Sequence, residues 1–561
     1  MGNVRGTRDH RYRCDLDDEK QKMAMIKKFV SAKTKTITGA ALVLGSASFV
    51  SRFIGVIRDR IFASQFGAGT ELDVYYAAFR IPDLVYNMII VGALSAGFIP
   101  VFTAVWMKDK KEAAVLTNNV INSLAVVLVG VLLILFLAMP WVMKLIVPGF
   151  DPDQMRQTVL LSRIMLASPL LLGLSGIASS VLQSLKCFFI YSLTPIFYNI
   201  GIIIGALFFV PLWGLAGLAY GVLLGAVLHL AIQMPTLYHA GFRYQPLIDL
   251  KSHELREIAK LMIPRTLTLA TSQLNMVVTT ILASTLAIGS LTIYNFANNL
   301  QFFPVGIIGV SFALAAFPTL SEYFAANDRN EFVAHLSNTI RQILFFIIPL
   351  SVVFLLLRAQ IVRVVLGAGK FDWSATITTA NALALFALSF FAQCLIPLLT
   401  RAFYAMHDTQ KPLLIAFVSV LINIIAALSL KESMGIVGLA LAFSIAAVFQ
   451  ATTLAVVLRR KIQSMNAQSI ATSSYKILVG GIAMAMLMQW LKGPIASLVD
   501  MTRFWGIFVQ GAATGVVGIG VYAVTLYLLR SPELMELLGS LHKRWLKIMP
   551  GHVEVTEPDE I

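Results

Sequence analysis

Long apolar stretches with few charges recur along most of the chain, and they constrain the fold more than any other feature. About 18 or more such residues can cross the hydrocarbon core of a bilayer as a helix. Runs such as 126–140 do not alternate apolar and polar residues, as the strands of a transmembrane barrel do. Of the 561 residues, 58% are hydrophobic and only 13% are charged. This apolar content exceeds what one soluble core can bury. We therefore predict an all-α polytopic membrane protein.

Glycines, prolines and charges interrupt these stretches and divide them into about fourteen predicted transmembrane helices. The predicted ranges are 38–65, 72–106, 114–147, 157–184, 188–210, 213–240, 254–287, 290–325, 331–366, 373–405, 411–430, 434–462, 471–492 and 503–529.

An internal repeat joins the first six predicted helices to the next six. Residues 213–219 (Trp-Gly-Leu-Ala-Gly-Leu-Ala) recur as 434–440 (Met-Gly-Ile-Val-Gly-Leu-Ala), at an offset of 221 residues. An even number of helices per repeat gives both copies the same orientation, with a central cavity between parallel lobes. We expect the following parts: a basic cytoplasmic tail (1–36), two six-helix lobes (37–241 and 242–463), two additional transmembrane helices (464–530) and a short cytoplasmic tail (531–561).

The net charge of +15 is concentrated in a few segments of the sequence. The tail 1–36 contains ten Lys or Arg residues, and further clusters lie at 108–111, 459–461 and 543–547. These clusters fall in alternate predicted loops, as the positive-inside rule requires for membrane proteins. We therefore predict a multi-pass protein of the bacterial cytoplasmic membrane with both termini in the cytoplasm, and no nucleic-acid partner. Met25 is an alternative start of the chain.

Signatures of catalysis are lacking in the sequence. There is no P-loop, no HExxH motif and no grouping of Ser, His and Asp. The three cysteines, Cys14, Cys187 and Cys394, are far apart and lack metal-ligand spacing. We expect a transporter rather than an enzyme, with no metal site and no cofactor. Its energy would come from a membrane potential, an ion gradient or the substrate gradient.

Charged residues inside the first predicted helices are the main candidates for substrate binding. They are Arg52, Arg58, Asp73 and Arg80. An arginine at mid-bilayer costs at least ~2.5–3.5 kcal/mol, so it normally faces protein or water. Guanidinium groups can hold a phosphate through two parallel hydrogen bonds. The alternative is that Arg58 forms a structural ion pair with Asp59 or Asp73.

Kink-forming residues interrupt the second and eighth predicted helices in parallel, which points to helices that line a substrate path. The predicted hinges are Pro82, Gly92 and Pro100 in the second helix, and Pro304, Gly306 and Pro318 in the eighth. Asn298, Asn299 and Gln301 lie just before the second kink and are predicted to line the cavity.

Several stretches together resemble the MurJ/MviN family of lipid II flippases, in the multidrug/oligosaccharidyl-lipid/polysaccharide exporter superfamily. The order and spacing of these stretches agree from about residue 38 to 530. They are Ser-Arg-Phe-Ile-Gly and Arg-Asp within 51–59, Phe-Gly-Ala-Gly to Phe-Arg-Ile-Pro within 66–82, Gly-Ala-Leu-Ser and Phe-Ile-Pro-Val-Phe within 92–102, Leu-Gln to Asn within 182–199, Phe-Pro-Val-Gly within 303–309, and Thr-Arg-Ala-Phe-Tyr-Ala to Pro within 400–412.

The resemblance implies a fold of two lobes with a cationic cavity that opens to either side of the membrane. It also implies a hydrophobic groove, formed by the last two helices, for a polyprenyl tail. The family's cavity arginines correspond to Arg52 and Arg58, and its acidic position at the head of the second helix corresponds to Asp73. The implied partners are the polyprenyl-pyrophosphate-linked glycopeptide lipid II and membrane lipids, with cell-wall synthesis proteins as a further candidate class.

The chain departs from the family pattern at several cavity positions. Tyr86-Asn87 and Val91-Gly92 replace a usual pair of arginines followed by Glu-Gly, and Asn298-Asn299 replaces a usual Asp-Arg. Acidic and basic residues are lost together, so no unpaired buried charge is created. Thr279 or Thr280 stands where many relatives have an acidic residue linked to cation binding, which weakens the expectation of sodium coupling.

Three hypotheses follow from the sequence. The first is a lipid II flippase that works by alternating access in peptidoglycan synthesis, with Arg52, Arg58 and Arg80 on the pyrophosphate and the amides of Asn298, Asn299 and Gln301 on sugar or peptide. The second is an exporter of another polyprenyl-linked oligosaccharide or of drugs, although a drug exporter would require more intramembrane carboxylates. The third is a membrane scaffold for cell-wall enzymes without transport activity.

Overall fold

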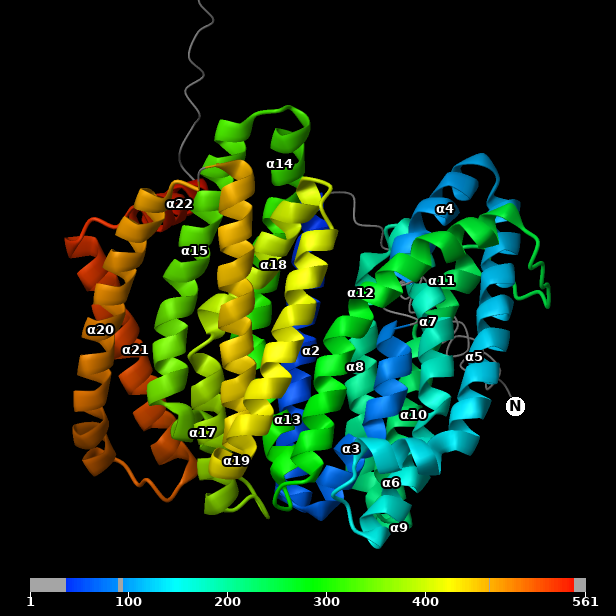
Figure 1. Cartoon of the computed structure of the whole chain (residues 1–561), viewed down its shortest axis with the longest axis horizontal. Coiled ribbons are helices and arrows are strands. Elements are labelled where there is room, and N and C mark those ends of the chain that lie inside the picture. The colour runs from blue at the N-terminus through cyan, green and yellow to red at the C-terminus, as the bar shows by residue number, and fades with distance from the viewer. Residues whose placement is uncertain (1–36, 89–93, 464, 549–561) are drawn as a thin grey trace, which may run out of the picture. The chain divides into compact units, whose positions relative to one another are not determined.

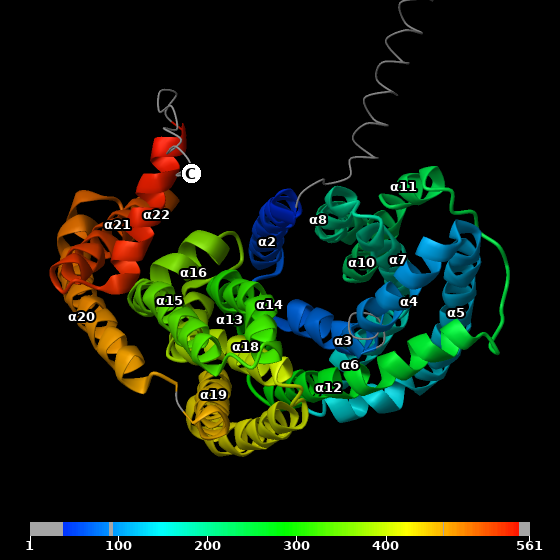
Figure 2. The ribbon, with the colours of Figure 1, turned by 90° about the horizontal axis from the view of Figure 1, so that it is seen from above.

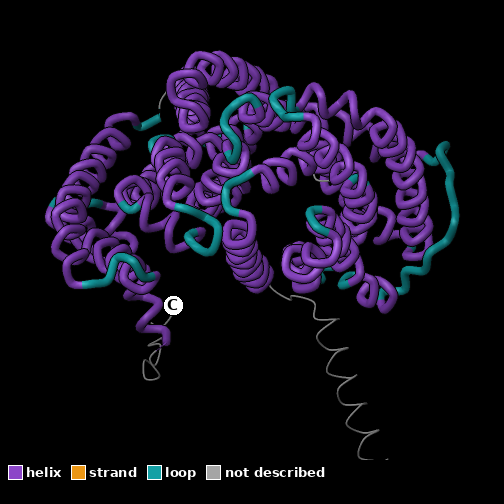
Figure 3. Tube along the Cα trace, turned by 90° about the horizontal axis from the view of Figure 1, so that it is seen from below, coloured by secondary structure: helices purple, strands orange, loops and turns teal. Residues whose placement is uncertain are grey.

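A computed structural model describes residues 37–88, 94–463 and 465–548 of the chain. Throughout these ranges the chain forms helices joined by loops, of which the connection 240–252 is long, and the described part contains no strand (Figure 3). The predicted all-α membrane class is thereby confirmed. Among the described residues, nine helices are long and apolar enough to span a membrane, or ten if the pair bent by 46° at residues 388–389 is one span. The predicted number of fourteen is not confirmed.

The chain divides into two compact units, of which the first extends to Thr292 and the second begins at Ile293. Figure 1 labels their helices along the chain. The first unit contains α2 (Ile37–Phe66), α3 (Thr70–Tyr86), α4 (Leu94–Lys108), α5 (Lys110–Ile146), α6 (Pro152–Met165), α7 (Ala167–Ser184), α8 (Phe188–Ile204), the π-helix η2 (Gly205–Phe209), α9 (Val210–Trp213), α10 (Ala216–Ala231), α11 (Met234–His239) and α12 (His253–Ser284).

The second unit contains most of α13 and all later helices. They are α13 (Ser290–Val305), the π-helix η3 (Gly306–Val310), α14 (Ser311–Ala325), α15 (Arg329–Leu356), α16 (Arg358–Leu366), α17 (Trp373–Ala387), α18 (Phe390–Ala405), α19 (Gln410–Ile462), α20 (Ala467–Leu498), α21 (Phe504–Leu528) and α22 (Pro532–Ile548).

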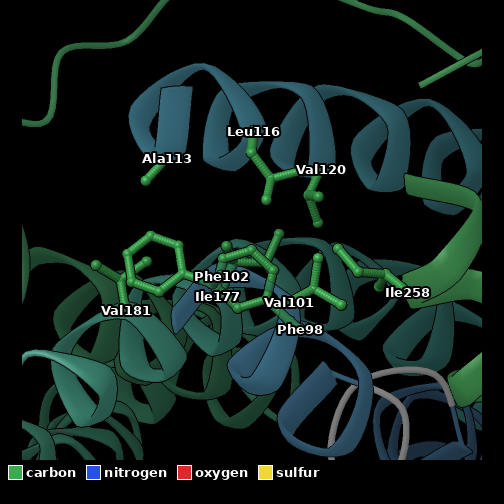
Figure 4. Packing of buried hydrophobic residues seen from close by; sticks show 9 residues of the cluster. All are labelled: Phe98, Val101, Phe102, Ala113, Leu116, Val120, Ile177, Val181 and Ile258. Carbon is green, nitrogen blue, oxygen red and sulfur yellow. The ribbon is translucent and has the colours of Figure 1, made fainter. Parts of the chain in front are cut away.

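A buried apolar cluster explains why α12 belongs to the first unit. Figure 4 shows Phe98 and Phe102 of α4 packed beside Leu116 of α5, Val181 of α7 and Ile258 of α12. A Cβ atom on Gly97 would lie 2.9 Å from the carbonyl oxygen of Ile258, so α4 and α12 approach closely where the side chain is smallest. The sequence prediction placed the region from residue 242 in the second lobe. The division into lobes by repeat remains a prediction.

Backbone conformation repeats at the predicted offset of 221 residues. Gly214 has φ 57° and ψ −145°, and Gly435 has φ 57° and ψ −136°, a conformation open essentially to glycine alone. Three residues after each, a second glycine packs against the backbone of the preceding helix. A Cβ atom at Gly217 would collide with the carbonyl carbon of Phe209, and one at Gly438 would lie 2.6 Å from the carbonyl oxygen of Leu430. The same local geometry at matching positions supports a duplicated unit.

The last transmembrane helices, α20 and α21, form a hairpin that packs on α15. Tyr522 of α21 is buried against Phe345 of α15 and donates a hydrogen bond of 2.8 Å to the carbonyl oxygen of Phe345. Met484 and Met488 of α20 fill the space beside them. The chain then continues into α22, which contacts α15 and α21 and is drawn in red beside α21 in Figure 2. This helix falls in the segment predicted as a short tail.

Candidate substrate-binding site

Arg58 of α2 is held by two neighbours in the first unit. Its Nε and one terminal nitrogen donate hydrogen bonds of 3.0 and 2.8 Å to the same carboxylate oxygen of Asp59. The other terminal nitrogen donates a hydrogen bond of 3.1 Å to the side-chain oxygen of Asn199 in α8. The Arg58 side chain is still 22% exposed, while that of Asp59 is 7% exposed. The predicted structural pair with Asp59 is therefore present, and it fixes the plane of the guanidinium group.

Asp73 is enclosed at the head of α3 and joins two distant parts of the first unit. It accepts hydrogen bonds from the backbone nitrogens of Gly289 (2.6 Å) and Thr292 (2.8 Å), and from the Thr292 hydroxyl (2.7 Å). These groups lie at the start of α13, where a carboxylate satisfies free backbone donors and the positive end of the helix dipole. Asp73 is only 4% exposed. This burial favours a role as an anchor between helices over the predicted contact with substrate.

The other predicted cationic residues of the first unit lie on the same two helices. Arg52 is half-buried on α2, six residues before Arg58. Arg80 is buried on α3, with 8% exposure. The structure thus places three arginines of the first unit in helices of a membrane-spanning chain, two of them with part of the side chain accessible. Their contact with a substrate stays a prediction.

A small cavity of about 180 Å³ lies inside the first unit, beside the predicted hinge Pro82. Asp83 of α3 and His229 of α10 line it together with the aromatic rings of Phe79, Tyr86 and Tyr198. Asp83 accepts a 2.9 Å hydrogen bond from the amide of Asn87. Sequence analysis did not single out His229 or Tyr198 as site residues, although a lone histidine in the apolar stretch 216–231 is a detectable signal.

A buried polar network fixes His229 on the wall of this cavity. The Ser175 hydroxyl lies 2.6 Å from Nδ1 of His229, and Ser175 also accepts a hydrogen bond from the amide of Gln233. Ser179 in turn donates a hydrogen bond of 2.9 Å to the side-chain oxygen of Gln233. The network joins α7 to the end of α10, so the cavity wall between these helices is rigid.

In the second unit, the predicted amides of α13 belong to an internal hydrogen-bonded chain. Gln301 donates to Asn298 (2.8 Å) and accepts from Gln393 of α18 (2.9 Å). Gln393 also donates to Ser389, which donates to Ser444 of α19, each at 2.9 Å. Asn298 and Gln301 are 5% and 1% exposed, whereas Asn299 is half-buried. The geometry therefore favours Asn299 over its neighbours as a group that can reach a ligand.

Of the predicted hinges that the structure describes, only Gly306 lies at an interruption of α-helical geometry, and the four prolines lie inside α-helices. Pro82 lies inside α3 and Pro100 inside α4, while Gly92 falls outside the described residues. In the second unit the π-helix η3 separates α13, which contains Pro304, from α14, which contains Pro318. Gly306 begins η3. A π-helical turn is a frequent mark of a functional irregularity in a helix.

Comparison with known sequences identifies a family over most of the chain. Residues 62–508 match the family model described as "Lipid II flippase MurJ". A "Probable lipid II flippase MurJ" of Rhizobium tropici is 28% identical over 539 residues, covering 93% of this chain and 97% of the relative. The "Lipid II flippase MurJ" of Burkholderia cenocepacia is 26% identical over 463 residues, covering 80% and 89%.

Solved structures show the same fold. The chain is similar to "Lipid II flippase MurJ, inward closed conformation" with a TM-score of 0.73 and 24% identity, covering 87% of this chain and 98% of that one. It is also similar to an inward-facing multidrug resistance MATE transporter of the MOP superfamily, with a TM-score of 0.65 and 15% identity, covering 74% and 96%. These identities are low, so the matches establish the arrangement of helices rather than a ligand.

Proposed function

Because this chain belongs to the MurJ family of lipid II flippases, we propose that it translocates lipid II across the cytoplasmic membrane by alternating access. The predicted family and transporter class are confirmed by the comparisons. We also propose which residues bind the substrate and how its headgroup is held.

The fixed geometry of Arg58 is the observation that supports its assignment to the substrate headgroup. Its guanidinium plane is already fixed by Asp59 and Asn199, so it loses little conformational freedom when it meets an anion. The pairing with Asp59 also avoids an unpaired charge in the membrane when substrate is absent. A pyrophosphate that approaches the exposed part of Arg58 would add charge-assisted hydrogen bonds, which are about twice as strong as neutral ones.

Arg52 supplies a second positive charge on the same helix, and Asn299 supplies an amide on α13. We infer that Arg52 and Arg58 engage the pyrophosphate and acidic groups at different depths, whereas Asn299 hydrogen-bonds the sugar or peptide. Asp73 and the chain from Asn298 to Gln393 hold helix ends and helix pairs in position. Cell-wall synthesis proteins are candidate partners of the same assembly, and both termini lie in the cytoplasm in this proposal.

Growth of a bacterium depleted of its own lipid II flippase tests the proposed function. Expression of this chain should restore growth, because a flippase that accepts lipid II replaces the missing step. An exporter of another polyprenyl-linked oligosaccharide, or a scaffold without transport, would reach the membrane at the same level and leave the cells to lyse. Immunoblotting of the membrane fraction separates this outcome from poor expression.

A further inference from the structure

An open cavity of about 630 Å³ lies in the second unit, where α20 begins. The residues that line it are far in sequence from those assigned to lipid II, and the proposed function does not involve them. Its wall is formed by one helix end and by polar side chains of α15 and α20: Arg341, Gln468, Ser469, Thr472, Ser473 and Lys476. Figure 1 shows the starts of α20 and α22 at the same end of this unit, together with the labelled helix α15.

Two cations face this cavity with hydrogen-bonding capacity left over. The Lys476 ammonium donates one hydrogen bond of 3.1 Å, to the carbonyl oxygen of Arg530, and an ammonium group has three donors. Arg341 contacts Glu533 at 3.5 Å and Asn338 at 3.2 Å through its terminal nitrogens. The Nε of Arg341 is buried and has no hydrogen-bond partner in the structure. Because this Nε has no accessible surface, a ligand in the cavity would meet the other part of the Arg341 side chain, which is 20% exposed.

The carboxylate beside these cations, that of Glu533, already has hydrogen-bond partners. Glu533 is 4% exposed and accepts hydrogen bonds from Ser473 (2.7 Å) and Ser531 (2.6 Å), besides its contact with Arg341. Lys476 therefore adds an uncompensated positive charge to the wall. The start of the 32-residue helix α20 adds backbone N–H groups and the positive end of a helix dipole, and Ser469 and Thr472 add hydroxyls. The chemistry of this wall suits a phosphate group.

The helix that follows indicates where such a phosphate would come from. α22 contacts α15 and α21, its Glu533 accepts a hydrogen bond from Ser473 of α20, and its sequence is strongly amphipathic. Its last two turns carry Lys543, Arg544 and Lys547. A basic amphipathic helix of this kind lies in the plane of the interface and attracts anionic lipids. Pro532, the first residue of α22, also lines the cavity, so a lipid attracted by this helix would have its headgroup beside the cavity.

We propose that the cavity lined by Arg341 and Lys476 binds the phosphate of an anionic phospholipid headgroup. The bound lipid would tie the start of α20 to α15 and α22, and it is a ligand separate from lipid II. The proposal does not depend on the proposed transport function, since it rests on residues of the second unit that take no part in that function.

Native mass spectrometry of the purified full-length protein tests the site with phosphatidylglycerol and phosphatidylcholine of the same acyl chains. Wild type should bind one phosphatidylglycerol at least several-fold more tightly than phosphatidylcholine. Lys476→Gln should weaken phosphatidylglycerol binding about tenfold, the effect of one charge-assisted hydrogen bond. The paired change Arg341→Gln/Glu533→Gln should weaken it similarly, and it removes both partners of the ion pair together so that neither charge is left unpaired.

Lys492→Gln is the matched control, because Lys492 lies at the opposite end of α20 and also donates to a backbone carbonyl, that of Leu356, at 2.9 Å. It should leave binding unchanged. Equal binding of the two lipids by wild type, or equal loss in Lys492→Gln and Lys476→Gln, would overturn the proposal. Inorganic phosphate is added in a further arm: displacement of the lipid by micromolar phosphate would show a site for the free anion instead.

Discussion

Arg58 illustrates how a membrane-embedded charge is stabilised and kept available at once. Its contacts with Asp59 and Asn199 come from one neighbour in sequence and one residue 141 positions away. The first contact was open to prediction from the sequence as a structural pair. The second required the packing of α8 on α2, which no local pattern reveals.

We expect Arg58→Lys to lower lipid II transport at least about tenfold although it keeps the positive charge. A lysine has no planar fork, so it cannot contact Asp59 and Asn199 and still present a second donor to a phosphate. The measurement is the transport rate at matched membrane levels of protein. Transport equal to wild type would show that charge alone suffices at this position.

Replacing Asp73 with alanine should lower the free energy of unfolding by about 3 kcal/mol or more. The change leaves two backbone donors and the Thr292 hydroxyl without their acceptor, and each unsatisfied buried group costs about 1–3 kcal/mol. Thermal unfolding of the purified protein measures the loss. Glu71→Ala, at an exposed position on the same helix, is the control and should unfold like wild type. An unchanged unfolding temperature for Asp73→Ala would argue against the anchoring role.

At the scale of helices, the apolar runs predicted positions well because insertion into a bilayer acts on local sequence. The predicted range 114–147 corresponds to α5 (Lys110–Ile146), and 411–430 with 434–462 corresponds to α19, which bends at Gly435. The break at Leu166 and the π-helices depend on tertiary packing and were not predicted. α22 was missed because its apolar residues cover only one face, so the apolar-run criterion assigned it to a tail.

Site residues were harder to predict than helices, because their partners are remote in sequence. Asp73 is predicted from the sequence to bind substrate, yet its carboxylate accepts hydrogen bonds from groups 216 and 219 residues away. Likewise, Asn119 of α5 pairs with both backbone groups of Asp249, at 2.9 and 2.7 Å, in a connection whose sequence has no distinctive pattern. Polarity in an apolar run identifies a residue that needs a partner, but it does not say which partner.

Gly217→Val and Gly438→Val should each lower the free energy of unfolding by about 3 kcal/mol or more. At both positions the new Cβ atom would collide with the backbone of the preceding helix, which cannot move aside as a side chain can. A Cβ atom on Gly130 of α5 would meet nothing within 4 Å, so Gly130→Val should be neutral. Thermal unfolding compares the three variants. Tolerance at only one of the two repeat positions would contradict their equivalence.

At the scale of the whole molecule, the distribution of basic residues predicts the orientation in the membrane. Cys14, Cys187 and Cys394 are first replaced by alanine, and single cysteines are then introduced. Asp153→Cys should react with an impermeant thiol reagent added outside intact cells, since the adjoining connection 147–151 contains no Lys or Arg. Lys111→Cys should react only after the membrane is opened, because it lies in a basic cluster. The reverse pattern would invert the predicted topology.

The most direct test of the account is the amount of lipid II on the outer face of the membrane in cells depleted of their own flippase. An externally added enzyme that cleaves lipid II reports this pool. We predict that wild type restores the cleavable pool. At equal membrane levels, Arg52→Ala and Arg58→Lys should restore much less of it. The Arg156 side chain is 82% exposed, so Arg156→Ala should behave as wild type. A cleavable pool that stays empty with wild type in the membrane, or that is equally full with all variants, would contradict it.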